Sequence, residues 1–125
     1  MKKIRHICGW LLLIASHYSG LSQVKDTLFF HNGDLLIGEL KSISLGKITF
    51  DDDNMDILCI KGTHIRTISA STHIYRLETV DDEIFYSSLE TSTDGRVRIQ
   101  VLGATKELAV ADISKLIPFS KGLFL

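Results

Sequence analysis

Apolar and polar residues alternate over short runs of the chain, and turn residues separate these runs. In 96–101, for example, Val97 and Ile99 alternate with polar neighbours. A period of two is typical of β-strands that have one buried and one solvated face. The pattern predicts strands at 27–30, 35–43, 47–51, 57–61, 65–69, 75–80, 83–91, 96–101, 107–110 and 114–118. The sequence therefore predicts an all-β chain.

Turn residues stand between the predicted strands. Asn32-Gly33 predicts a type I′ hairpin turn between the first two strands, because both residue types tolerate the positive φ angles that this turn requires. Further turns are expected at Leu45-Gly46, Asp81-Asp82 and Asp94-Gly95, and brief 3₁₀ turns are expected at 63–65 and 111–113.

The second half of the chain repeats the first at a nearly constant offset. Residues 28–50 align with 77–99 at an offset of 49, and 65–68 align with 113–116 at an offset of 48. Two such matches in the same order predict an internal duplication. The one-residue change falls in a loop, where insertions cost little.

Each predicted copy consists of short strands and tight turns, which suits a small, strongly bent barrel. A unit of about fifty residues is near the lower size limit for folding alone. The two copies, at 23–70 and 71–120, are therefore expected to pack together or to share strands around 69–72.

The amino-terminal segment has the order of a secretory signal peptide. A basic start at 2–5 precedes an apolar run at 7–15, and small and polar residues lead to a cleavage point before Gln23. The apolar run is well short of the roughly twenty residues that span a bilayer. We expect a cleaved signal peptide at 1–22, with an uncleaved anchor as the alternative. Cys8 lies too early in the segment to carry a lipid anchor.

Charge and composition indicate which classes of binding partner are unfavourable. Hydrophobic residues make up 45% and charged residues 23%, an ordinary globular balance. Without the three basic residues of the predicted signal peptide, the net charge is about −4. An acidic exported domain is a poor electrostatic partner for nucleic acid or anionic lipid. No long alternating run follows Pro118, so no membrane span is predicted in the mature chain.

A cluster of carboxylates is the first candidate for chemistry. Asp51, Asp52, Asp53 and Asp56 offer the oxygen ligands that Ca²⁺ prefers. An EF-hand takes its ligands at set positions, and this loop lacks the required glycine and the distal glutamate. An acidic, solvated hairpin loop is the preferred interpretation.

His31, His64 and His73 remain after the predicted cleavage, and their spacing matches no two-histidine zinc pattern. They are interpreted as surface histidines. Cys59 is the one cysteine beyond the predicted signal peptide and stands in an apolar run. It is interpreted as a small strand residue, because a nucleophile needs a nearby base and an electropositive setting.

Catalytic and nucleotide-binding signatures are missing from the sequence. It has no Gly-x-Ser-x-Gly elbow, no Gly-x-Gly-x-x-Gly loop and no Walker loop. A Ser-His-Asp set can be assembled on paper from any chain this rich in serine, so we discount it. The sequence assigns no catalytic, cofactor-binding or metal-binding residue and predicts no cofactor.

A small basic stripe is formed by Arg96 and Arg98 on one predicted strand, with Lys47 nearby in the register of the repeat. RNA binding requires a wider basic surface with stacking aromatic side chains. Export and the acidic balance of the mature chain argue against it. No nucleic-acid partner is predicted.

Aromatic residues occur at corresponding strands of the two copies, at Phe29, Phe30, Phe85 and Tyr86. Some of them are expected in the core. An exposed one would form an interaction patch, because aromatic side chains favour interfaces.

Residues 26–50 carry a family resemblance. They contain an Asn-Gly-Asp turn at 32–34, a Gly-Glu-hydrophobic-Lys stretch at 38–41 and a Gly-Lys-hydrophobic-Thr-Phe strand at 46–50. This order resembles the start of the mature part in Bacteroidetes proteins of the DUF481 family, a family of unknown function, and a weaker likeness covers 24–118. Gly-Asp-x-x-x-Gly strands of this kind also occur in SH3-like and Sm-like small barrels.

The resemblance implies an all-β fold of two tandem SH3-like or Sm-like small barrels, located in the periplasm or at the outer membrane. Full members of the family continue into a long region resembling an outer-membrane barrel. This chain would correspond to their amino-terminal soluble part.

The sequence as a whole predicts an exported, non-enzymatic β-domain of the cell envelope with a structural or protein-interaction role. Exposed strand edges would dock an envelope protein by strand addition. The alternative is a metal-dependent or hydrolytic periplasmic enzyme that uses the acidic loop 51–56 with His31 or His64. The sequence leaves the oligomeric state open.

Overall fold

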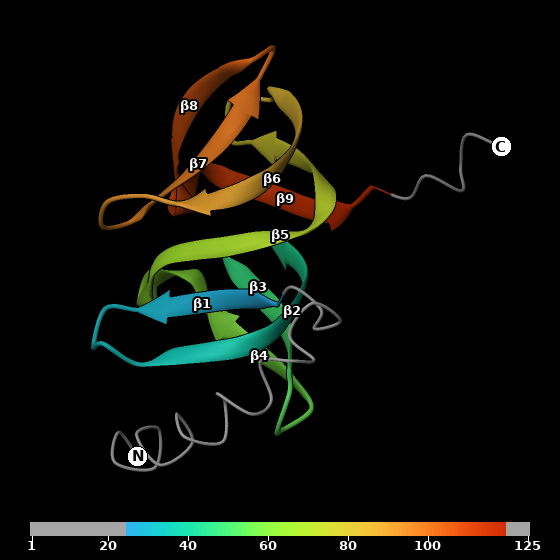
Figure 1. Cartoon of the computed structure of the whole chain (residues 1–125). Helices are drawn as coiled ribbons and strands as arrows, with labels where there is room; N and C mark the ends of the chain where they lie inside the picture. The colour runs from blue at the N-terminus through green and yellow to red at the C-terminus, as the bar shows by residue number, and fades with distance from the viewer. Residues whose placement is uncertain (1–24, 120–125) are drawn as a thin grey trace, which may run out of the picture.

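The computed structural model describes residues 25–119, and strands make up most of this part of the chain (Figure 1). The predicted all-β class is confirmed. The strands are β1 (Asp26–Phe30), β2 (Leu35–Ser44), β3 (Lys47–Asp52), β4 (Ile57–Lys61), β5 (Ile65–Thr79), β6 (Ile84–Thr91), β7 (Arg96–Val101), β8 (Ala104–Ala109) and β9 (Ile113–Pro118). Two 3₁₀ turns, η2 (Gly62–His64) and η3 (Val110–Asp112), lie within one residue of the predicted places. The predicted signal peptide at 1–22, with Cys8, lies outside the described residues.

The hydrogen-bonded strands close into a small barrel. The pairing order is β4-β3-β2-β1-β5-β6-β7-β8, and β9 pairs with both β2 and β5. The antiparallel pairs β1–β2, β2–β9, β9–β5 and β5–β1 therefore form a ring. Strands β4 and β8 stand at the two ends of the path and form its edges.

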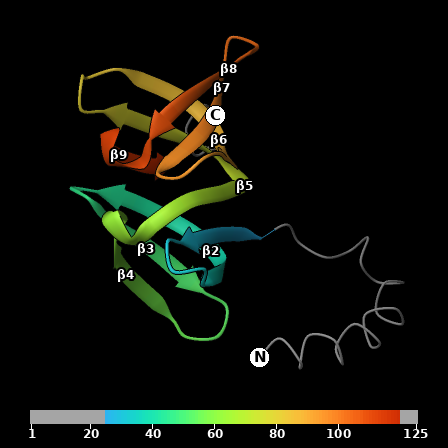
Figure 2. The ribbon, with the colours of Figure 1, turned by 90° about the vertical axis from the view of Figure 1, so that its left-hand side faces the viewer.

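Strand β5 joins two groups of strands, which lie one above the other in both ribbon views (Figures 1 and 2). We call β1–β4 the amino-terminal lobe and β6–β9 the carboxyl-terminal lobe. The prediction of separate strands at 65–69 and 75–80 is wrong, because β5 continues from Ile65 to Thr79. Its first residues pair with β1 and its last residues pair with β6 and β9. The lobes thus share one strand instead of meeting at a loop.

The β1–β2 turn differs from the predicted type I′ turn. Gly33 has a positive φ of 94°, whereas Asn32 does not have a positive φ. The Gly33 amide donates to the Phe30 carbonyl (3.1 Å) and the Phe30 amide donates to the Asp34 carbonyl (2.9 Å). This closes a three-residue loop with glycine in the bulge position. The Asp34 amide also donates to Asn32 Oδ1 (2.9 Å), a local side-chain bond that favours this turn.

Turns with two consecutive positive φ angles occur elsewhere, at Leu45-Gly46 (52° and 78°) and Leu102-Gly103 (53° and 82°). The sequence did not predict the second of these turns. As a result β8 begins at Ala104, three residues before the predicted start of that strand. A leucine in this backbone region is strained, because its Cβ crowds the following carbonyl.

The two lobes pair their strands in corresponding registers. Leu28 faces Ile68 where β1 meets β5, and Leu77 faces Leu116 where β5 meets β9. The offsets of 49 and 48 are those of the sequence alignment, and a register shift precedes the last residue of both β1 and β5. The turn bond from the Gly62 amide to the Gly46 carbonyl (2.8 Å) also has a counterpart, from Val110 to Gly95 (2.8 Å).

One apolar core runs through both lobes. Its fully buried members come from seven strands, at Leu28, Leu40, Ile48, Phe50, Ile68, Leu77, Leu89, Val97, Ile99 and Leu116 among others. These are the inward positions of the alternating pattern. Gly38 lets β2 approach β3 closely, because a Cβ there would lie 2.0 Å from the Asp51 carbonyl oxygen.

Candidate functional site

The acidic loop 51–56 forms a hairpin that its own hydrogen bonds hold in place. The Asp52 amide donates to the Asp56 carbonyl (3.1 Å), and the Asn54 amide donates to Asp52 Oδ2 (2.9 Å). Asp53 pairs with Lys25 (3.4 Å). Two of the four carboxylates are thus already used, one by the backbone of the loop and one by an exposed ion pair.

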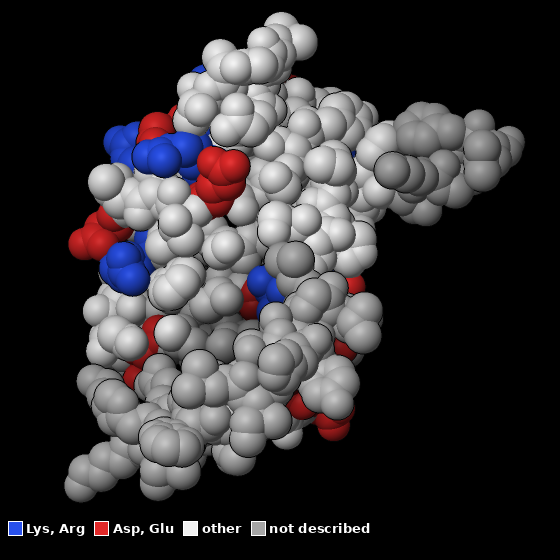
Figure 3. All heavy atoms as spheres, in the orientation of Figure 1, with Lys and Arg blue, Asp and Glu red and all other residues white. Residues whose placement is uncertain are grey.

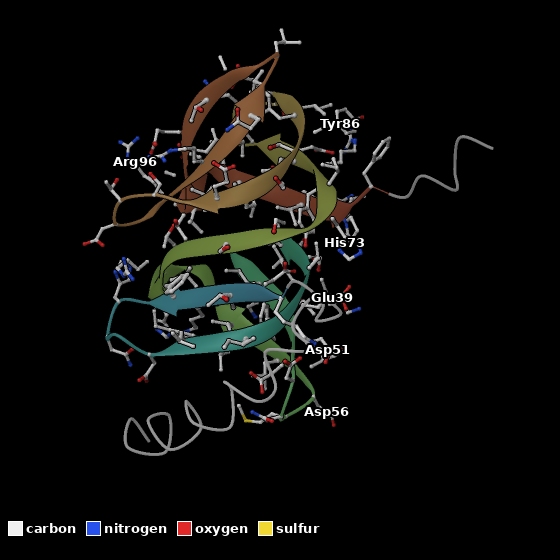
Figure 4. All side chains as sticks on the ribbon, viewed as in Figure 1. Glu39, Asp51, Asp56, His73, Tyr86 and Arg96 are labelled. Carbon is white, nitrogen blue, oxygen red and sulfur yellow. The ribbon has the colours of Figure 1, made fainter. Side chains whose placement is uncertain are left out.

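This loop lines an open groove with parts of β2 and β5. The residues that line it include Glu39, Asp51, Asp53 and His73. His73 Nε2 lies 3.7 Å from Glu39 Oε2, and Lys41 Nζ lies 3.2 Å from Glu39 Oε1. Figure 4 shows His73, Glu39, Asp51 and Asp56 along one side of the molecule.

A buried carboxylate lies beneath the groove. Asp26, at the start of β1, is fully buried, and three donors bond to its carboxylate at 3.2 Å or less. The donors are the Leu40 amide (2.8 Å), the Thr72 hydroxyl (2.9 Å) and the Tyr75 hydroxyl (3.2 Å). Burial, followed by the charge of Asp26, raises the pKa of Tyr75 above its ordinary value, so the phenol remains a donor. Asp26 therefore ties β1, β2 and β5 together.

The sequence interpretation missed Asp26, although a signal for it was present. Asp26 occupies the same inward phase of β1 as Leu28 and Phe30, so alternation alone places a carboxylate toward the core. A buried carboxylate needs donors, and those donors come from residues far away in the sequence. The pattern therefore indicated burial but not the partners.

The link from Asp26 to the surface runs through Thr72. Thr72 Oγ1 lies 3.1 Å from His73 Nδ1 as well as within hydrogen-bond distance of Asp26. Because the oxygens of Asp26 already accept from three groups, they are not directed at the groove. Among residues 25–119, no set of three or more His, Cys, Asp and Glu side chains is grouped to hold a metal ion.

The other two histidines lie in a different place. His31 and His64 line a hollow at the β1–β2 turn, floored by Phe30 and Leu36. The His31 amide donates to the His64 carbonyl (3.0 Å). The structure thus brings His31 and His64 together, and it brings His73, not these two, to the acidic loop.

The edge strand β4 exposes apolar side chains. Ile57 is 61% exposed and Cys59 is exposed beside it, on the outer face of the strand. Cys59 is in a strand, as predicted. Within the described part of the chain, β4 pairs with β3 and with no other strand. Its second edge thus presents unpaired backbone groups next to apolar side chains.

The edge strand β8 is polar at the corresponding positions. Glu107 accepts from the Arg98 guanidinium (2.9 Å), and Lys106 Nζ lies 5.8 Å from the centre of the Phe85 ring. Hydrogen bonds from Ser92 and Arg98 lower the pKa of Glu107, which keeps it charged. Charged side chains on an edge strand discourage pairing with another chain.

The predicted basic stripe is divided in the structure. Arg96 and Arg98 lie on β7, and Arg98 is paired with Glu107, whereas Lys47 lies on β3 opposite Lys61. Figure 3 shows basic and acidic side chains interspersed on the visible face of the carboxyl-terminal lobe. This arrangement offers no continuous basic track on that face.

The four aromatic residues divide between core and surface. Phe30 and Phe85 pack against the core, and Phe29 lies under the Arg66 guanidinium at 5.5 Å. Tyr86 is 51% exposed, and its ring meets that of Phe119 edge-on at 4.9 Å. Tyr86 is thus the exposed aromatic that the sequence allowed for.

Comparisons with known proteins give no relative: no protein-family model, no curated protein and no solved structure matches the chain. A search of residues 25–119 for helices finds none long and apolar enough to cross a membrane.

Proposed function

We propose that the protein is an exported, non-enzymatic β-domain of the cell envelope that binds a protein partner along β4. The observation that carries this proposal is the contrast between its edges: β4 is apolar except for Lys61 at its end, whereas β8 carries a lysine and a paired glutamate in its middle. Natural sheets avoid exposed apolar edges unless something pairs with them. Strand addition satisfies both the backbone groups and the apolar side chains of such an edge.

Export is supported by the order of the first 22 residues, which is basic, then apolar, then small and polar. The acidic balance of the remaining chain supports a protein partner over nucleic acid. The location that follows is the periplasm or the outer membrane. Fractionation of cells with intact-mass analysis tests it: a mass beginning near Gln23 in the periplasm is expected, and a full-length mass in the membrane pellet contradicts it.

Duplication is part of the same proposal. The two lobes are interpreted as tandem SH3-like or Sm-like copies, at 23–70 and 71–120. Matching offsets in the sequence and in the strand registers support this interpretation. We also retain the resemblance to the amino-terminal part of DUF481-family proteins as a proposal, based on residues 26–50.

A binding role is favoured over catalysis by how the polar groups are used. The carboxylate of Asp26 accepts hydrogen bonds from Leu40, Thr72 and Tyr75. In the acidic loop, the Asp52 side chain accepts a hydrogen bond from a backbone amide of the same loop. The enzymatic alternative needs Asp51–Asp56 beside His31 or His64, but these histidines line a separate hollow. No observation favours a second function.

A matched pair of variants tests the proposal. Ile57 on β4 faces Asp51, and Thr105 on β8 faces Gln100 in the corresponding register. Ile57→Lys adds a charge to the apolar edge, while Thr105→Lys adds the same charge to the polar edge. Immobilised chain should capture a specific protein from an envelope fraction, Thr105→Lys should capture it equally, and Ile57→Lys should lose it. Equal capture by both variants would contradict a role for β4.

A further inference from the structure

The two ends of β4 carry opposite charges. The acidic loop with Asp53 and Asp56 precedes the strand, and Lys61 ends it. Lys61 faces Lys47 directly across the β3–β4 pair. Like charges at directly opposed positions are destabilising unless an anion lies near them.

These lysines find no anion within the lobe. No ion pair joins Lys47 or Lys61 to a carboxylate among the described residues, and the same holds for Asp56. Each molecule therefore presents, along one edge, an unpaired basic end, an apolar middle and an acidic end at which Asp56 has no ion pair. The charges of such an edge are complementary to those of a second copy that lies antiparallel to it.

We propose that β4 pairs antiparallel with β4 of a second copy of this chain, about a two-fold axis that passes beside Cys59. This inference rests on the proposed function, because it names the partner that β4 takes. Cys59 is the middle residue of the five-residue strand Ile57–Lys61. The in-register antiparallel pair therefore sets Cys59 opposite Cys59, and Ile57 opposite Lys61, of the second copy.

The antiparallel direction follows from the charges. It brings the acidic loop of each molecule next to Lys61 of the other, with Lys47 one strand further away, and it does so at both ends of the pair. A parallel pair would instead place acidic loop against acidic loop and lysine against lysine. Pairing also covers Ile57, the most exposed apolar side chain on the strand, and satisfies backbone groups that β3 does not reach.

The interface is small, since one strand of five residues supplies it. Interfaces of this size belong to weak, reversible complexes. Sedimentation equilibrium of the mature chain over a concentration series is therefore the first experiment. A monomer–dimer equilibrium is expected. Ile57→Lys should raise its dissociation constant about tenfold or more, because the new lysine meets Lys61 at both ends of the pair. Thr105→Lys should leave the constant unchanged.

Cross-linking distinguishes an antiparallel from a parallel pair of β4 strands. A short bis-maleimide should join the chain into a covalent dimer through Cys59, which lies at the axis. In the double variant Ile57→Cys, Cys59→Ser, the two thiols of an antiparallel pair lie about 14 Å apart along the strands, so cross-linking should fall sharply. Efficient cross-linking of the double variant would show a parallel pair and overturn the proposal.

The experiments separate this inference from the proposed function. A chain that stays monomeric at every concentration, with Ile57→Lys still losing capture of an envelope protein, overturns self-pairing and leaves β4 as the docking edge for another protein. A dimer that both lysine variants form equally overturns self-pairing through β4 and removes the support for that edge. A dimer lost in Ile57→Lys alone and cross-linked at Cys59 supports both.

Discussion

Strands β4 and β8 occupy corresponding places in the two lobes, because Asp51 faces Ile57 on β3–β4 as Gln100 faces Thr105 on β7–β8. Where β4 exposes Ile57 and Cys59, β8 carries threonine and a glutamate paired with arginine. The lobes thus share a pairing scheme and differ in how their edges are protected. The scheme accounts for the fold, and the difference at the edges indicates where a partner would bind.

A second contrast lies inside the molecule. Asp26 begins β1, and Tyr75 occupies the corresponding position on β5, 49 residues later. The two side chains are not merely analogous, since Tyr75 donates a hydrogen bond to Asp26 (3.2 Å). Positions that correspond in the sequence alignment are therefore a donor and an acceptor, and their bond joins the amino-terminal lobe to the shared strand β5. The predictions below test these contrasts.

Removal of the buried Asp26 carboxylate should cause the largest loss of stability among the predicted changes. Asp26→Ala leaves the Leu40 amide and the Thr72 and Tyr75 hydroxyls without their shared acceptor, and it should lower the free energy of unfolding by about 3–4 kcal/mol. Denaturant unfolding measures this loss. Asp53→Ala, which removes an exposed ion pair with Lys25, is the control and should cost below about 0.5 kcal/mol. Similar losses for the two variants would mean that Asp26 is not the link between β1, β2 and β5.

Substitutions where β2 approaches β3, and at the corresponding place between β6 and β7, should have different effects on stability. Gly38→Ala places a Cβ against the Asp51 carbonyl, and the forced separation of the strands should cost about 2–3 kcal/mol. The corresponding residue is Ser87, whose Oγ accepts from the Gln100 amide (3.0 Å). Ser87→Ala loses this bond and the one that the hydroxyl donates to the Ser88 carbonyl (2.6 Å), and it should cost about 1–2 kcal/mol. Thermal unfolding of both variants ranks them, and the reverse order would contradict the close approach of β2 to β3.

The Tyr75 hydroxyl should give an alkaline dependence of stability. Because burial raises the pKa of Tyr75, the folded chain keeps a proton that the unfolded chain releases above about pH 10. Its contribution is therefore full below that pH and is lost as the pH rises further. Tyr75→Phe should cost about 1 kcal/mol at neutral pH and make the alkaline decline shallower. Unfolding across the alkaline range checks this, with the exposed Tyr86→Phe as a control that keeps the decline.

The smallest predicted effect is a gain in stability when a strained turn leucine is replaced. Leu45 and Leu102 are exposed at turn tips with positive φ angles of 52° and 53°, a region that asparagine adopts at lower cost than leucine. Leu102→Asn should raise the free energy of unfolding by about 0.5–1 kcal/mol, and Leu45→Asn should give a similar gain. Denaturant midpoints measure both. A loss in either variant would show that the leucine side chain makes a contact that outweighs the strain.

Much of the local structure could be predicted from the sequence. The alternation of Val97 and Ile99 with polar residues fixed the phase of β7, and the Gly95 and Gly46 turns marked strand ends. These features depend on neighbours in the chain, so a single sequence contains them. The internal offset also matches the registers that Leu28 and Leu77 adopt in their strand pairs.

What the sequence did not predict depends on residues far apart in the chain. The unbroken course of β5 and the closure of the barrel by β9 follow from pairing between distant strands. The same is true of the partners of Asp26 and of the placement of His73, not His31 or His64, beside the acidic loop. The apolar run 57–60 is visible in the sequence. Its exposure depends on the position of β4 at the end of the strand order, which the sequence does not show.

The central claim is that β4, and not β8, is the surface through which the protein associates. A photo-reactive amino acid placed at Ile57 or at Thr105 in cells that produce the full chain tests it most directly. The account predicts a discrete cross-linked product from position 57, containing either a second copy or an envelope protein, and none from position 105. Equal products from both positions, or a product from position 105 alone, would contradict it.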